Sequence, residues 1–250
     1  MTRRHPVGTR TEAARRIRDE LRHDIQSGSF KNGLLPSEHD LMIQQNASRS
    51  AVRLALSLLR SEGLVTRLQG RGTTVIRETP VFVPLDPPAA LADVVEGGRT
   101  RVRFTNLSLI VTAAQAGVAG KLGLDVGDRV VFLERLMFLD DEPCTLRASW
   151  IPEPVAEPIM TGRVNLQNAM FQLLENEVGL DVGVVEFSIE ATLSDETVSS
   201  LLGVVPGSPL LLVENLTRLR DGSPVEYGFA RTRADRVRFV TDVSISPRSS

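Results

Sequence analysis

The chain has 250 residues, 42% of them hydrophobic and 24% charged, which is typical of a folded globular protein with one large or two modest domains. No apolar run approaches the roughly 18 residues that a membrane-spanning helix needs, so we expect no contact with a membrane. The single cysteine, Cys144, excludes an internal disulfide and favours a cytoplasmic protein.

The net charge of −2 conceals an uneven distribution along the chain. Residues 1–78 hold 14 Lys and Arg against 8 Asp and Glu, a net of +6, whereas residues 79–250 hold 15 against 23, a net of −8. A small basic segment joined to a larger acidic one predicts a polyanionic partner for the first part alone. Chance clustering of charges is the alternative that charge alone leaves open.

The first part begins with three predicted helices. Apolar residues at helical spacing and the cap residues below predict helices over about 11–26, 37–44 and 48–61. Ser37 is a good N-cap, and Asp40 stands three residues later as in a capping box. Ser48 is the cap of the third helix, and Gly63 lies where a helix ends.

A glycine turn between two β-prone runs follows these helices. The runs are Leu64–Leu68 and Thr73–Ile76, on either side of Gln69–Gly72, and they predict a β-hairpin. Three helices and a two-stranded wing therefore fit within residues 1–78. In the third helix Arg49 and Arg53 lie four residues apart, on a different face from the apolar stripe.

Four segments of this region occur in the order and at the spacing of one family of regulators. They are Leu35–Glu38, Ser48–Arg53, Glu62–Val65 and Gln69–Thr73. On these residues the region resembles the winged helix-turn-helix of GntR-family transcriptional regulators. The resemblance implies that residues 1–78 bind double-stranded DNA.

The residues themselves agree with DNA binding. A helix with hydroxyls and guanidinium groups on its first turns can enter a major groove, where Arg49 and Arg53 could meet guanine edges or phosphates. The glycines beside Arg71 would let the backbone approach a minor groove. A solvated surface charge is the alternative for any one of these arginines. The DNA-binding residues that we predict are His39, Ser48, Arg49, Ser50, Arg53, Gly70, Arg71 and Gly72.

His39 departs from the family pattern. It stands after Pro-Ser-Glu, where many members carry an arginine that the resemblance implies to touch DNA. A contact with DNA and a plain surface role both stay open for this histidine.

Residues 79–90 are expected to form a proline-rich linker. Pro80, Pro84, Pro87 and Pro88 fall within nine residues, which disfavours regular structure and favours an extended connection.

Residues 91–250 predict a mixed α/β domain, so the whole chain belongs to the α+β class. The predicted strands are 102–111, 129–139, 145–151, 184–193, 210–220, 225–232 and 238–245. The predicted helices are 113–121, 169–178 and 196–202.

This second domain contains an internal echo. Leu122–Asp128 and Leu202–Ser208 have similar sequences, and each precedes a strand and then a turn that ends in proline. The two copies lie at a constant offset along the chain. We interpret the echo as a duplicated strand-turn-strand unit in one sheet, with a cleft between the halves.

The second domain also resembles a known sensor. The residues that carry the resemblance are Leu202–Gly207, Asp221–Tyr227, Ala234–Arg236 and Phe239. They resemble the UTRA effector domain of the HutC-type subfamily, whose fold is similar to that of chorismate lyase. The resemblance implies that a small-molecule effector binds here.

Four residues are candidate effector contacts on this resemblance. Arg135 matches the first of two arginines in sugar-phosphate-sensing members, and Glu226 matches a later glutamate. Met137 replaces the second arginine, and Arg147 stands at a neighbouring glutamate position. The phosphate-cradling arm of those relatives is not recognisable in Asp93–Gly98, so we expect an anionic effector other than a phosphosugar. An ordinary ion pair on the sheet surface is the alternative.

These observations together predict a one-component repressor that a small anionic metabolite releases from its operator. Operators with two-fold symmetry favour a homodimer. The alternative is an enzyme of chorismate-lyase-like fold fused to a DNA-binding domain. All three histidines, His5, His23 and His39, lie in the first domain, and we expect no catalytic residues, no metal and no cofactor.

Overall fold

A computed structural model describes residues 10–30, 32–68, 72–76, 81–84 and 101–241, with only the backbone described for 81–84. The chain divides into two compact units, Met1–Pro80 and Val81–Ser250. We call them the first and the second unit. No helix in the described part of the chain is long and apolar enough to cross a membrane.

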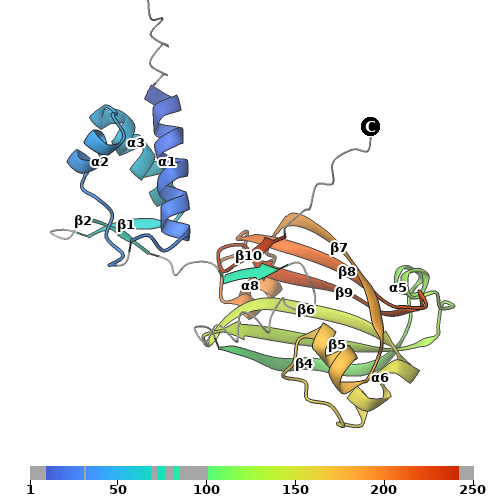
Figure 1. Ribbon diagram of the computed structural model, residues 1–250. Coiled ribbons are helices and arrows are strands. Elements are labelled where there is room, and N and C mark those ends of the chain that lie inside the picture. The colour runs from blue at the N-terminus through green and yellow to red at the C-terminus, as the bar shows by residue number, and fades with distance from the viewer. Residues whose placement is uncertain (1–9, 31, 69–71, 77–80, 85–100, 242–250) are drawn as a thin grey trace, which may run out of the picture. The chain divides into compact units, whose positions relative to one another are not determined.

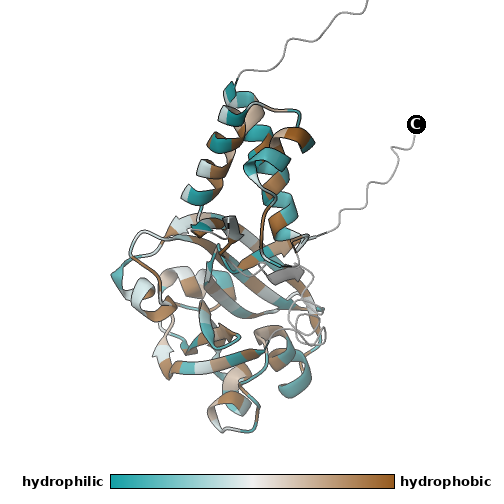
Figure 2. Cartoon of the chain, turned by 90° about the vertical axis from the view of Figure 1, so that its left-hand side faces the viewer, coloured by the Kyte–Doolittle hydropathy of each residue, from teal (hydrophilic) through white to brown (hydrophobic). Residues whose placement is uncertain are grey.

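The first unit has three helices and one hairpin (Figure 1). They are α1 (Arg10–Gln26), α2 (Glu38–Gln44), α3 (Arg49–Ser61), β1 (Val65–Leu68) and β2 (Gly72–Val75). The two strands pair antiparallel. The helices carry both hydrophilic and hydrophobic segments (Figure 2), because each turns an apolar stripe towards a shared core.

The predicted caps are confirmed. The Ser37 side chain accepts from the Asp40 amide, and the Asp40 side chain accepts from the Ser37 amide, which completes the capping box of α2. The Ser48 hydroxyl accepts from the Ala51 amide at the start of α3. Gly63 follows the end of α3 with φ of 66°, a conformation that favours glycine.

The second unit is built on a six-stranded antiparallel sheet in the order β4-β5-β6-β9-β8-β7 (Figure 1). Its strands are β4 (Val102–Ala113), β5 (Arg129–Leu139), β6 (Glu142–Pro152), β7 (Val182–Leu193), β8 (Pro209–Leu219) and β9 (Pro224–Arg233). The six strands predicted for this sheet are thus confirmed, and their ends differ by up to three residues.

The internal echo proves to be a duplication of a larger unit. Two helices belong to it, α5 (Ala116–Leu122) and α8 (Glu196–Leu202). The shift along the chain that takes α5 onto α8 also takes β4 onto β7 and β5 onto β8, with the same bounds at both ends. The sheet is therefore two β-α-β-β halves joined along β6 and β9. The predicted cleft between the halves stays a prediction.

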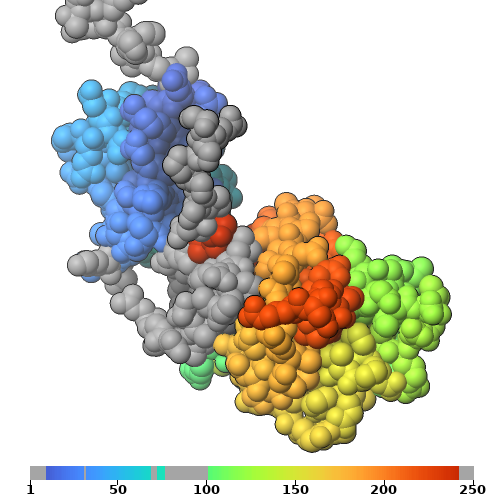
Figure 3. Space-filling model, turned by 45° about the vertical axis from the view of Figure 1, so that its right-hand side comes forward, coloured from blue at the N-terminus to red at the C-terminus, as the bar shows by residue number. Residues whose placement is uncertain are grey.

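Each helix packs against the opposite half. Residues of α5 share a hydrophobic cluster with Leu216 and Tyr227 of the second half. Residues of α8 share another cluster with Leu136 and Leu146 of the first half. In the space-filling view the green surface of the first half lies against orange and red surface of the second half (Figure 3). This exchange of helices holds the two halves together through two separate hydrophobic clusters.

The connection between the halves contains helices that cover one face of the first half. They are α6 (Glu153–Met160), α7 (Met170–Gln172) and a π-helical turn over Leu173–Glu177. The sequence predicted one helix over 169–178 and missed α6. Pro154 is tolerated in the first turn of α6, but Pro158 inside it hides the helix from pattern analysis. The helix predicted over 113–121 begins only at Ala116, because β4 continues to Ala113.

The prediction that 79–90 lacks regular structure is wrong for four residues. Strand β3 (Val81–Pro84) pairs in parallel with β10 (Val237–Val240). The run Val81–Val83 is β-prone, and Pro84 comes at the end of the pairing, where its missing N–H costs little. Residues 85–90, and residues 242–245 of the last predicted strand, lie outside the described part of the chain.

Candidate nucleic-acid interface and ligand site

The outer face of α3 is basic. Arg49, Arg53 and Arg60 are exposed and follow one another at spacings of four and seven residues, which places them along one side of the helix. The opposite side carries Ala51 and Ala55, which are buried in the core. The sequence predicted this division for Arg49 and Arg53 and did not extend it to Arg60.

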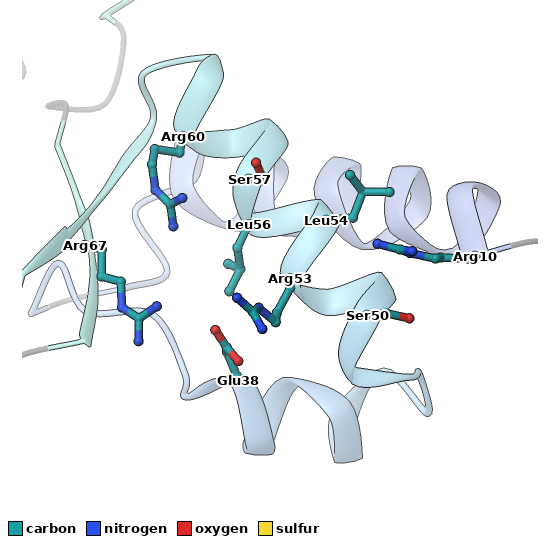
Figure 4. A pocket seen from close by; sticks show the side chains of 9 residues that line it. All are labelled: Arg10, Glu38, Ser50, Arg53, Leu54, Leu56, Ser57, Arg60 and Arg67. Carbon is teal, nitrogen blue, oxygen red and sulfur yellow. The ribbon is translucent and has the colours of Figure 1, made fainter.

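A groove of about 410 Å³ lies along this basic face (Figure 4). Four arginines line it, from three elements: Arg10 of α1, Arg53 and Arg60 of α3, and Arg67 of β1. Glu38 is the one carboxylate among the lining residues. The groove therefore has an excess of positive charge, which suits a phosphate backbone.

Most of these charges are not neutralised by neighbours. Within the described residues, no ion pair involves Arg53, Arg60 or Arg67, while Arg49 lies 3.6 Å from Glu38. Cations on a protein surface without carboxylate partners remain available to an external anion. Arg60 and Arg67 were missed because each stands alone in the sequence, and only the fold brings them beside Arg53.

The other predicted DNA contacts are distributed as follows. His39 and Ser50 are exposed, on α2 and α3. Ser48 is also exposed, but its hydroxyl caps α3 and lies 3.1 Å from the Ser50 hydroxyl. Gly72 has φ of 94° at the start of β2. Gly70 and Arg71 lie outside the described residues.

In the second unit, Arg135 of β5 is almost completely buried, with 1% of its surface exposed. Its Nη1 donates to the carbonyl oxygens of Leu166, at 3.2 Å, and Asn168, at 2.8 Å. The Phe104 ring lies 4.8 Å from the guanidinium carbon. These contacts fix the guanidinium between the sheet and the segment that precedes α7.

The other two nitrogens of this guanidinium have no partner among the described residues. Arg135 Nε and Nη2 are buried, and no residue in the described part of the chain accepts a hydrogen bond from them. Burial lowers the pKa of Arg135 to about 10, with a smaller contribution from Arg147, while Glu226 opposes the shift. The group is still charged at neutral pH. A buried cation with two unmet N–H groups is rare in folded proteins and indicates a place for an acceptor.

Arg147 of β6 stands directly opposite Arg135 in the sheet. Its Nη2 donates to Asn215 Oδ1 at 2.8 Å and to Glu226 Oε1 at 2.9 Å. Its Nε donates to the Ser149 hydroxyl at 3.3 Å. Protein acceptors therefore already engage two of the three guanidinium nitrogens of Arg147.

Glu226 is fully buried and has a complete set of donors. Oε1 accepts from Arg147 and Ser149, and Oε2 accepts from Asn215, at 2.5 Å, and Thr217, at 2.8 Å. A carboxylate offers about four lone-pair sites, so these bonds use its capacity. In this arrangement Glu226 holds Arg147 and Asn215 in place, and its direct contact with an effector stays a prediction.

Met137 supplies an apolar side to the same face. It is buried in a cluster with Phe104, Leu139 and Cys144. Burial also raises the pKa of the Cys144 thiol to about 11, which makes it a poor nucleophile.

The fold thus brings all four predicted effector residues onto one face of the sheet. Asn215 and Ser149 were missed, because their polar side chains carry no sequence motif. The predicted arm, Asp93–Gly98, lies outside the described residues. Among the residues that the structure describes, no group of three His, Cys, Asp or Glu side chains could hold a metal ion.

Comparisons with known proteins match two families to the two parts of the chain. A family described as "UTRA domain" matches residues 97–238, and one described as "Bacterial regulatory proteins, gntR family" matches residues 13–75. The chain is 27% identical to the HTH-type transcriptional repressor NagR of Bacillus subtilis (strain 168), covering 90% of this chain and 91% of that protein. It is also 27% identical to the regulator GmuR of the same organism, covering 92% and 97%.

Solved structures share the fold. PhnF from Mycobacterium smegmatis superposes with a TM-score of 0.65 at 23% identity, covering 92% of this chain and 100% of that one. YydK from Bacillus subtilis gives a TM-score of 0.57 at 19% identity, covering 93% and 99%.

Proposed function

Because the chain belongs to the GntR family of bacterial regulatory proteins and carries a UTRA domain, we propose that it is a repressor whose hold on an operator is released by a small anionic metabolite. The coarser function follows from the family: the chain is a DNA-binding transcriptional regulator with an effector-binding domain, like its homologues. The direction of regulation, the anionic effector and the residues at each site are the proposal.

The basic face of α3 supports the proposed roles within the DNA-binding unit. Arg49 and Arg53, on its first two turns, are assigned to bases and nearby phosphates in a major groove. Arg60 and Arg67 are assigned to phosphates farther along the groove of Figure 4.

The observation that carries the effector site is the pair of buried, unmet N–H groups on Arg135. Leaving such donors unsatisfied costs about 1–3 kcal/mol each, and more for a charged group. A bound anion would accept both bonds and neutralise the charge. The effector is therefore assigned to the face that carries Arg135, Met137, Arg147 and Glu226.

A homodimer is proposed because one winged helix offers few contacts for specific binding. The edge strand β7 supports the second unit as the interface, since four of its apolar side chains are exposed: Val184, Phe187, Ile189 and Leu193. The dimer is proposed to be cytoplasmic.

The enzyme alternative gains no specific support. The second unit has no histidine in its sequence, and the relatives reported above are named as regulators. Ligand binding without turnover is therefore proposed.

The test has two stages. The full chain first selects its operator from a random DNA pool, and a thermal-shift screen of metabolites finds a stabilising ligand. Fluorescence anisotropy then measures operator affinity with and without that ligand. We expect the ligand to weaken binding 5–150-fold, the range of roughly 1–3 kcal/mol that is typical of coupled sites. Tighter binding with ligand would contradict a released repressor.

Variants separate the two roles. Arg53→Ala should cost roughly 1–3 kcal/mol at one base position if Arg53 contacts a base. A uniform loss with a flatter salt dependence would assign Arg53 to phosphate instead. Arg135→Ala and Glu226→Gln should keep operator binding and lose the response to ligand. If both variants responded as the wild type does, the effector site would be wrong.

A further inference from the structure

The unmet nitrogens of Arg135 lie on one edge of the guanidinium plane. Nη1 donates to the carbonyls of Leu166 and Asn168, whereas Nε and Nη2 have no partner within the residues that the structure describes. Nε and Nη2 present two parallel N–H bonds in the plane of the group. Such a pair matches the two oxygens of a carboxylate.

The second unit uses this edge for carboxylates elsewhere. Arg129 Nε and Nη2 donate to the two oxygens of Glu153, at 2.6 and 2.7 Å. Arg233 Nε and Nη2 donate to the two oxygens of Asp235, at 3.2 and 3.0 Å. Arg135 presents the same pair of donors without the carboxylate.

The charge of the surroundings favours an anion with a single charge. Arg135, Arg147 and the fully buried Glu226 interact with one another and sum to +1. A monoanion makes this buried group neutral. A dianion would leave one excess negative charge in a place shielded from water, which is costly without further donors.

Further donors for a dianion are scarce on this face. The Nε and Nη2 groups of Arg147 are already engaged by Ser149, Asn215 and Glu226. On the other side of Arg135, the buried Phe104 and Met137 present apolar surface. On the side of Phe104 and Met137, a third phosphate oxygen would meet apolar surface instead of an N–H group. On the other side, Nη1 is the one nitrogen of Arg147 that Ser149, Asn215 and Glu226 leave unengaged.

We propose that the effector presents a monocarboxylate to the Nε and Nη2 edge of Arg135, with an apolar portion against Phe104 and Met137. This inference rests on the proposed function, in which Arg135 binds the effector. It adds the chemical class of the ligand and the atoms that bind it.

The test uses the full chain and the ¹⁵N–¹H signal of Arg135 Nε, identified by its loss in Arg135→Lys. Acetate and methyl phosphate are titrated separately at constant ionic strength, with acetamide as the neutral control. The second pKa of a phosphate monoester is about 6, so methyl phosphate is a dianion at about pH 8 and mainly a monoanion at about pH 5.

At about pH 8 we expect acetate to shift the Arg135 signal in a saturable way and to bind at least about tenfold more tightly than methyl phosphate. Near pH 5 the difference should narrow, because both probes then carry at most one charge. Arg218→Lys, a change at an exposed ion pair of β8, should leave the acetate titration unchanged.

Met137→Arg provides a gain of function. A second cation on this face should raise the affinity for methyl phosphate at about pH 8 by at least about tenfold. The fluorescence of Trp150, the only tryptophan of the chain, reports whether this variant folds. If it does not fold, the wild-type titrations alone decide.

The outcomes separate the two proposals. Equal or tighter binding of methyl phosphate to the wild type at about pH 8 would overturn the monocarboxylate and leave Arg135 as an anion site. No shift of the Arg135 signal with either anion would overturn both the monocarboxylate and the assignment of the effector to Arg135. Operator release by a screened metabolite would then be the surviving part of the proposed function.

Discussion

The two halves of the sensor sheet share one framework and differ in chemistry. The shift that takes α5 onto α8 also takes Arg135 of β5 onto Asn215 of β8. Arg147 faces Arg135 in the sheet as Gly228 faces Asn215, so Arg147 of β6 corresponds to Gly228 of β9. Both cations thus lie in the first half, and the second half supplies Asn215 and Glu226, which accept hydrogen bonds from Arg147. The sheet is therefore symmetric in its strands but not in its charges, because Asn215 and Gly228 of the second half stand where the first half has Arg135 and Arg147.

We expect the largest loss of stability from removing Glu226, the carboxylate that accepts hydrogen bonds from residues of both halves. Glu226→Ala leaves Arg147, Asn215 and Thr217 without their shared acceptor, and breaking a buried pair costs about 3–5 kcal/mol. Urea unfolding followed by Trp150 fluorescence measures the loss in this domain.

A matched control stands at the corresponding place in β6. Thr145 lies two residues after Pro143, as Glu226 lies two after Pro224, and it makes one hydroxyl bond to Thr232. Thr145→Ala should cost only about 1 kcal/mol. Equal losses in the two variants would contradict the asymmetry of the halves.

A second prediction concerns Gly228, which stands opposite Ser149 in the sheet. A Cβ on Gly228 would lie 2.7 Å from the Ala148 carbonyl oxygen and 2.9 Å from Glu226 Oε1. Gly228→Ala should therefore destabilise the domain by about 1–3 kcal/mol and disturb the polar network. In the same urea assay Gly120→Ala, at a helical site with nothing within 4 Å, should be neutral or stabilising. A tolerated Gly228→Ala would show that the network can relax.

The two helices differ in their caps, which gives a third and smaller effect. Asp195 caps α8 by accepting from the Val198 amide, whereas Gln115 makes no such side-chain bond at the start of α5. Gln115→Asp should stabilise the domain by about 1 kcal/mol, as a rise in the urea midpoint. Asp195→Ala should destabilise the domain by a similar amount and lower the urea midpoint. If both substitutions changed the midpoint in the same direction, the assigned difference between the two caps would be contradicted.

The smallest effect concerns a glutamate that the echo duplicates. The pKa of Glu214 is lowered by hydrogen bonds from Lys121 and then Tyr227. Because the pKa of Glu214 is lower in the folded state, its ionised form stabilises the fold at pH values above the pKa of the unfolded state, which is about 4.3. This stabilisation is lost as the pH falls through the pKa of the folded state. Glu214→Gln should cost less than about 1 kcal/mol at pH 7 and nothing in acid.

Glu134 is the control for this change. It occupies the corresponding position of the first half, and no ion pair is described for it among residues 101–241. Glu134→Gln should leave the unfolding midpoint unchanged at both pH values. A loss equal to that of Glu214→Gln would contradict the assigned role of Lys121.

Local signals made the first unit and the strands of the second predictable. Ser37, Ser48 and Gly63 act through neighbours in sequence, so their roles could be derived from spacing. The strands of the sheet were found by their β-prone runs, and the duplication by similar residues at a constant offset.

Long-range contacts were not predictable in the same way. The carbonyls that bind Arg135 come from Leu166 and Asn168, far along the chain, and backbone carbonyls leave no trace in a sequence. The pairing of β3 with β10 joins segments from opposite ends of the second unit. The groove could not be predicted for the same reason, because only the fold brings Arg60 and Arg67 close to Arg53.

The pairing of β3 with β10 has a consequence for signalling. Val81, the first residue of the sensor unit, is in register with Val237, and Val237 packs in the cluster that contains Phe104 and Met137. Strand β3, with which the second unit begins, thus pairs with β10, and β10 packs through Val237 against the apolar residues beside Arg135. Under the proposed function, thermodynamic linkage requires reciprocity: the operator would lower the affinity for the effector by the same factor by which the effector lowers the affinity for the operator.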